Sequence, residues 1–242
     1  MLLTKRISDK VVIKHTSLAA TGKLIDVYTD INDFDANELA RIANLAYHQI
    51  KKKFKFVYHH QLLGKKIKIY CSDKVKVSHV HGGYRQAIDP LGEIFLNYRA
   101  ATGAVRGENA TYIHELTHLF AWKFYSHTLR EGLADYVAFA LQKDSSIGAV
   151  PADFALSRKE FIQFSKYWAT TKKPPRRLKT DIDFRRGYYF SSRVFVTQLI
   201  KDFGMEKFMN LYDSSEPEVV IAHLYKKSRQ ELVTHLIASI NE

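Results

Sequence analysis

Two histidines and one glutamate are spaced as the ligands and base of a metal site. The segment His114-Glu115-Leu116-Thr117-His118 has the form HExxH. On a helix, residues four apart lie on one face, about 40° apart around the axis, so both imidazoles can reach one ion. Zinc lowers the pKa of a bound water towards neutrality, and Glu115 can then take its proton. The segment therefore predicts a zinc centre with Glu115 as the general base.

A second pair of carboxylates follows at helical spacing. A catalytic zinc normally has three protein ligands and a water. Glu131 and Asp135 are four residues apart, so Glu131 can be the third ligand while Asp135 accepts a hydrogen bond from a ligand histidine. Two alternatives stay open. Thr128 and Glu131 also fit a capping box at a helix start, and His127 is a rival third ligand.

The two motifs together resemble those of a known group of enzymes. HELTH followed by EGLADYV resembles the gluzincin metallopeptidases, and is more closely similar to the short peptidase-MA-like proteins that include plant basic secretory proteins. The resemblance covers residues 94–141 and extends weakly to 189–204. It implies a zinc cofactor and the following site residues: His114, His118 and Glu131 as ligands, Glu115 as base, and Asp135 as the hydrogen-bond partner of a ligand.

The resemblance also implies how substrate is held. In gluzincins the strand before the HExxH helix forms the edge of the sheet and binds peptide as an added strand. The best match is residues 93–98, with these contact residues: Ile94, Phe95, Leu96 and Asn97. A downstream tyrosine often stabilises the oxyanion, and the candidates are Tyr188 and Tyr189. The spacing between His118 and Glu131 is shorter than in thermolysin-like enzymes, which is a departure from the pattern.

Hydrophobic periodicity predicts the elements that position these residues. Strands are expected at 11–15, 24–29, 66–71, 81–88 and 93–99, and helices at 36–50, 109–124, 128–143, 158–170, 191–203 and from 228. Strict alternation predicts that 66–71 is half-buried. Local signals set three helix boundaries: a cap at Asp33 or Asp35, a stop at Gly204 and a capping box at Ser228 and Glu231.

The order of these elements predicts an α+β, zincin-like fold. Residues 1–125 would form an N-terminal lobe with a small mixed sheet and the HExxH helix. Residues 126–242 would form an all-helical C-terminal lobe that carries Glu131, and both lobes would make one catalytic unit.

The composition of the chain limits the classes of protein to which it can belong. The 242 residues are 46% hydrophobic and 26% charged, as in globular proteins, and a single cysteine, Cys71, excludes an internal disulfide and a Cys-based zinc site. The net charge of +12 suggests an anionic surface as partner, but no nucleic-acid-binding motif is present. We expect no transmembrane segment. Without a signal peptide in residues 1–20, we expect a cytoplasmic protein if Met1 is the native start, and a secreted one if a leader was removed.

The sequence therefore favours a zinc-dependent peptidase acting on peptide or protein substrates. The alternative is a zincin-like protein that binds zinc without proteolysis, as a regulatory or basic-surface binding module. Glu115 favours the enzyme, because a protein without hydrolytic activity has no chemical need for this base.

Overall fold

The computed structural model describes residues 9–55, 65–80, 92–121, 124–142, 154–212 and 214–239. Within these residues the protein is mixed α+β, mostly helical with one small mixed sheet, as the sequence predicts at this level. It divides into two compact units, Met1–Phe120 with Leu141–Gly148, and Ala121–Ala140 with Ala149–Glu242. Among the described helices, none has the length and apolar character needed to cross a membrane.

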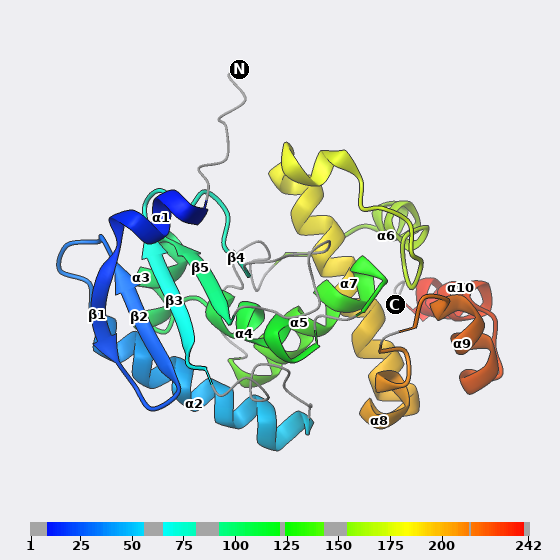
Figure 1. Ribbon diagram of the computed structural model, residues 1–242. Coiled ribbons are helices and arrows are strands. Elements are labelled where there is room, and N and C mark those ends of the chain that lie inside the picture. Colours follow the sequence, from blue (N-terminus) through cyan, green and yellow to red (C-terminus); the bar gives the residue numbers. More distant parts are fainter. Residues whose placement is uncertain are drawn as a thin grey trace. The chain divides into compact units, whose positions relative to one another are not determined.

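A five-stranded sheet is the centre of the first unit. Its strands are β1 (Ser17–Thr21), β2 (Ile25–Thr29), β3 (Ile67–Ser72), β4 (His79–Val80) and β5 (Glu93–Asn97). Figure 1 shows them in the spatial order β1-β2-β3-β5-β4. β2, β3 and β5 are parallel, while β1 and β4 pair antiparallel with their neighbours. The strands expected at 24–29 and 93–99 are confirmed with shorter bounds, and that at 81–88 lies outside the described residues.

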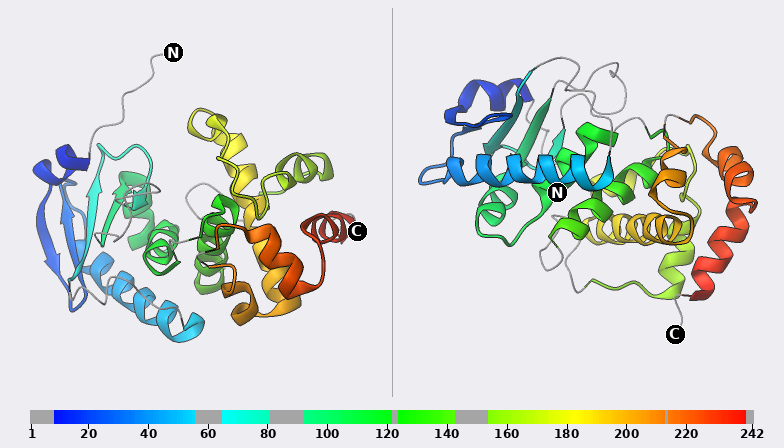
Figure 2. Two further views of the ribbon diagram at one scale, coloured as in Figure 1. Left: turned by 45° about the vertical axis from the view of Figure 1, so that its right-hand side comes forward. Right: turned by 90° about the horizontal axis from the view of Figure 1, so that it is seen from below.

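The helices of the first unit are α1 (Asp9–His15), α2 (Ala36–Phe54), α3 (Tyr98–Val105) and α4 (Thr111–Ala121). α2 contacts β1 and β2, and Figure 2 shows it lying along the sheet. The predicted cap at Asp35 is confirmed, because its Oδ1 accepts a hydrogen bond of 2.9 Å from the backbone N–H of Glu38. This bond satisfies one of the N–H groups that a helix start leaves without an intrahelical partner.

The expected strand at 11–15 is wrong, because these residues belong to helix α1. Val12 is the buried residue of this helix and packs with Tyr70, Val75 and Phe95. β-branched residues lower helix propensity only slightly, so a tertiary contact can decide the outcome. The strand expected at 66–71 is confirmed as β3, but the expectation that it is half-buried is wrong, because α1 packs on Tyr70, which is only 3% exposed.

A row of rings crosses the sheet next to α1. Tyr28 is opposite Tyr70, Tyr70 is opposite Phe95, and Phe95 is opposite His79. The ring centroids of each neighbouring pair are 5.0 Å apart. Such cross-strand aromatic pairs stabilise one register over its one-residue slips. The row therefore fixes the alignment of four strands.

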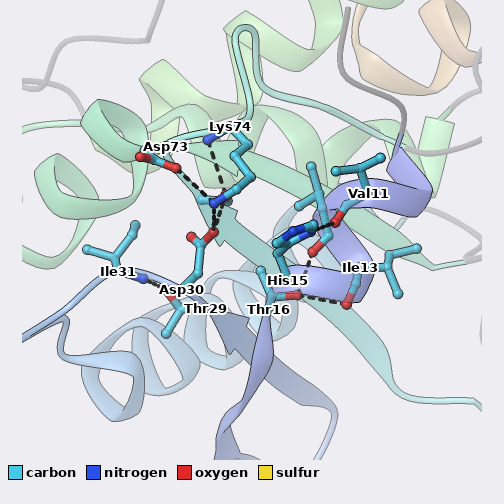
Figure 3. Close-up of polar contacts among 11 residues, drawn as sticks. Val11, Ile13, His15, Thr16, Thr29, Asp30, Ile31, Asp73 and Lys74 are labelled. Atoms are coloured by element: carbon cyan, nitrogen blue, oxygen red, sulfur yellow. Dashed lines mark hydrogen bonds and ion pairs between the residues drawn. The ribbon is translucent and has the colours of Figure 1, made fainter.

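An ion pair joins the carboxyl ends of two neighbouring strands. Asp30 follows β2, and its Oδ2 accepts hydrogen bonds from Ser72 Oγ at 2.9 Å and from Lys74 Nζ at 2.7 Å. Figure 3 shows Lys74 reaching over the Asp30 carboxylate, with Asp73 beside it. Since Ser72 ends β3, these bonds hold the ends of β2 and β3 together.

Among its described residues, the regular elements of the second unit are all helices. Its helices are α5 (His127–Leu141), α6 (Arg158–Ser165), the 3-10 helix η2 (Arg176–Lys179), α7 (Ile182–Phe203), α8 (Met205–Met209), α9 (Pro217–Tyr225) and α10 (Arg229–Ser239). α5 and α7 approach closely at Gly132, where a Cβ would lie 2.4 Å from the backbone oxygen of Ser192. Only glycine allows this approach.

Two predicted helix boundaries in the second unit are confirmed. α7 ends at Gly204, whose positive φ of 84° departs from helical geometry and suits glycine. Ser228 and Glu231 form the capping box that starts α10, with hydrogen bonds of 2.6 and 3.1 Å. Two lengths differ from expectation, since α7 begins at Ile182 rather than 191, and α6 ends at Ser165 rather than 170.

Candidate metal centre

Helix α4 carries the HExxH segment through the interior of the first unit. Asn109 starts it by accepting a hydrogen bond of 2.8 Å from the backbone N–H of Thr111. Its apolar residues are buried, which holds the helix in place: Ile113, Leu116, Leu119 and Phe120. His114 and Glu115 are buried too, at 7% and 5% exposure. Polar groups at such depth need partners, and one partner of His114 is the ring of His118.

The two histidine side chains converge on a common point. The Nε2 atoms of His114 and His118 are 3.0 Å apart, and the rings stand at 88° to each other. Two nitrogen ligands of one tetrahedral zinc, each about 2.0–2.1 Å from the ion, are about 3.3 Å apart. The observed separation fits a shared metal. Ligand atoms of His114, Glu115 and His118 all lie within 4.8 Å of one another, and no other such group occurs in the described ranges.

This donor set suits several metals. Neutral imidazole binds zinc, copper, iron and nickel, and the two nitrogens alone do not choose among them. Zinc is the expectation from the sequence motif.

Glu131 and Asp135 lie on α5 in the second unit, at 6% and 1% exposure. Oε1 of Glu131 accepts hydrogen bonds from Arg130 Nε at 3.2 Å and Nη2 at 3.1 Å. The same oxygen lies 3.7 Å from Nε2 of His127. The carboxylate of Glu131 is therefore held by two basic side chains of its own helix. The roles of Glu131 as third ligand and of Asp135 as its helper remain predictions.

The capping-box alternative for Glu131 is wrong. α5 begins at His127, so Thr128 lies inside the helix and is not its cap. Thr128 Oγ1 instead donates to the backbone oxygen of Tyr167 and accepts from the N–H of Ala169, both at 3.0 Å. Thr128 thus anchors the loop after α6.

The two candidate tyrosines have different surroundings. Tyr188 is 1% exposed, and its hydroxyl lies 3.1 Å from Nδ1 of His127. Tyr189 is half-buried, with its ring centroid 6.4 Å from that of His127. The second unit thus brings His127, Glu131 and Tyr188 together. Sequence reasoning treated His127 only as a rival ligand, although its spacing of four residues from Glu131 is a signal that the two are neighbours on one helix.

The strand that was expected to lie at the sheet edge has neighbours on both sides. β5 is not at the edge of the described sheet, because β4 pairs with it at Ile94 and Phe95. Ile94, Phe95 and Leu96 are each 0% exposed, and the N–H of Asn97 donates to Ser78 Oγ at 3.2 Å. The expectation of an edge strand at 93–98 is therefore wrong. β4 has only two residues, too few for an alternating pattern to indicate it.

Comparison of the sequence with models of known protein families and with the curated proteins finds no match. The resemblance to gluzincins therefore rests on the HELTH and EGLADYV segments alone.

Proposed function

We propose that this protein is a zinc-dependent peptidase. The observation that carries the proposal is the pair of Nε2 atoms, 3.0 Å apart on one buried helix, with Glu115 in the same cluster. His114 and His118 would hold the ion, and Glu131 would be the third protein ligand. When bound, zinc would lower the pKa of a water and polarise the substrate carbonyl.

Side chains of the protein would carry out the proton transfers of the reaction. Glu115 would accept the proton of the attacking water and pass it to the leaving amine. Tyr188 or Tyr189 would donate a hydrogen bond to the oxyanion. Tyr188 is supported by His127, which fixes the position of its hydroxyl. The net charge of +12 would favour the approach of acidic peptides and anionic surfaces.

The substitution Glu115→Gln tests whether Glu115 is the general base. The amide keeps the shape of the side chain but cannot accept the proton, so we expect hydrolysis of a denatured-protein mixture to fall by about 100-fold or more. Zinc content, measured by elemental analysis, should be unchanged. Glu108→Gln, at an exposed position in the same unit, is the matched control. Full activity in the Glu115 variant would refute the assignment.

The same assay separates peptidase activity from zinc binding alone. A wild-type protein that contains zinc but does not cleave the mixture, with or without chelator, would be the non-proteolytic zinc-binding module. Cleavage that stops on chelation and returns with zinc supports the peptidase.

A further inference from the structure

Half of the net charge of the chain lies in one short part of the second unit. Residues 166–186 contain eight basic and two acidic residues, which gives a net charge of +6 out of the total of +12. Four of the basic side chains are exposed and, in the part of the chain that the structure describes, form no ion pair: Lys172, Lys173, Arg176 and Lys179. We call these four residues the basic patch. Because like charges gathered in this way repel one another, the patch favours an anionic partner.

The local fold holds the basic patch at the surface. Arg176 and Lys179 are three residues apart in the 3-10 helix η2, so their side chains lie on the same side of it. Leu178 between them is 8% exposed and packs inward, which leaves the two cations facing solvent. Arg185 of α7 donates from Nε to the backbone oxygen of Leu178 at 2.7 Å, and this bond ties η2 to α7. The cations are therefore held in position before any partner binds.

The two acidic residues of this segment are paired with arginines outside the basic patch. Asp181 Oδ2 accepts a hydrogen bond of 2.7 Å from Nε of Arg177. Asp183 Oδ1 accepts one of 3.2 Å from Nη1 of Arg186. Each carboxylate thus has an arginine of its own. The positive charge of the basic patch is therefore left for a partner from outside the chain.

An exposed apolar side chain next to the basic patch indicates the kind of partner. Ile182, the first residue of α7, is 56% exposed and follows Lys179 by three residues. At a lipid surface an apolar side chain can enter the acyl boundary while cations contact anionic headgroups. Single-stranded nucleic acid would instead use an aromatic ring on which bases stack, and the guanidinium of Arg177 lies over the ring of Phe184, 4.9 Å from its centroid. An anionic lipid surface therefore fits better.

We propose that the basic patch and Ile182 bind the protein to the surface of membranes that contain anionic phospholipids. The cations would contact the headgroups, and Ile182 would enter the interface between headgroups and acyl chains. Near such a surface each Lys or Arg raises the affinity by about 5-fold. This inference goes beyond the proposed peptidase activity. It uses only residues of the second unit and does not depend on the metal centre.

The test is sedimentation of the full-length protein with vesicles of phosphatidylcholine, prepared with and without phosphatidylserine. We expect binding only when phosphatidylserine is present, and weaker binding as salt is added, because salt screens exposed charges. One triple variant removes the lysines of the basic patch: Lys172→Gln, Lys173→Gln and Lys179→Gln. Its affinity for the anionic vesicles should fall by about 100-fold.

A control triple variant loses the same amount of charge at exposed positions elsewhere: Lys51→Gln, Lys52→Gln and Lys201→Gln. Lys201 lies about 28 Å along α7 from Ile182, and the other two belong to the first unit. The control should keep its affinity within a few-fold. Equal losses in the two variants would show that total charge alone attracts the protein, which would overturn the proposal.

A second variant separates a lipid surface from other polyanions. Ile182→Ser should lower the affinity for the anionic vesicles by about 10-fold, because it removes an apolar group that is buried on binding. Binding of the same variant to a single-stranded RNA should equal that of the wild type. Failure of the wild type to bind the anionic vesicles would overturn the proposal. Tighter binding of the RNA than of the vesicles would overturn it too, and would assign the basic patch to nucleic acid.

Discussion

Two nitrogens of the His127 ring face different partners: Nδ1 lies 3.1 Å from the hydroxyl of Tyr188 and Nε2 lies 3.7 Å from Oε1 of Glu131, so the Tyr188 hydroxyl also stabilises the fold. We expect Tyr188→Phe to lower the free energy of unfolding by about 1 kcal/mol, because it leaves a buried imidazole nitrogen without that hydrogen bond. Urea denaturation measures the change. Tyr98→Phe, at an exposed position, should have no effect. Equal stability of wild type and Tyr188→Phe would show that the bond contributes nothing.

At the scale of single residues, the sequence predicted that His114 and His118 converge, but it did not predict the partners of Glu131. The spacing of His114 and His118 requires only a helix, so the convergence of their nitrogens could be expected. The hydrogen bond between Arg130 and Glu131 could not be expected, because side chains of adjacent helical residues normally diverge.

At the scale of elements, the start of α6 is a capping box with a pH dependence. Hydrogen bonds from the side chain and backbone of Ser157 lower the pKa of Glu160. A pKa that is lower in the folded state contributes stability above the unfolded value of 4.5, and this is lost as pH falls through the folded pKa. Ser157→Ala should cost about 1 kcal/mol at neutral pH and less in acid.

Urea unfolding at neutral pH and near the pKa of Glu160 measures this difference. Ser215→Ala, at an exposed position outside any helix, is the control and should change stability at neither pH. A cost of Ser157→Ala that is the same at both pH values would contradict the proposed link to Glu160.

Helix boundaries could be predicted from the sequence where a residue acts on its own backbone neighbours. Asp35, Gly204 and Ser228 act through their own backbone neighbours, and each boundary was found. α1 was mistaken for a strand because contacts with distant residues of the sheet decide its conformation. β1 was missed because its sequence, SLAAT, lacks a clear alternation of apolar and polar residues.

At the scale of the whole molecule, metal binding should raise stability by mass action. Zinc at 100 times its dissociation constant should add about 2.7 kcal/mol, which raises the melting temperature by roughly 5–10 °C. Thermal unfolding with zinc and with chelator measures the shift. His114→Ala should abolish it, while His223→Ala, at an exposed position of α9, should keep it. A shift of full size in His114→Ala would place the metal elsewhere.

The buried thiol of Cys71 in β3 can be used to measure how often the first unit opens. Cys71 is the only cysteine of the chain and is 0% exposed, and burial raises its pKa. Since the thiolate is the reactive form, an aqueous labelling reagent reaches and modifies Cys71 only when the sheet opens. The labelling rate therefore measures how often the first unit opens, without any engineered probe. Because the second unit has no cysteine, its own unfolding adds no signal.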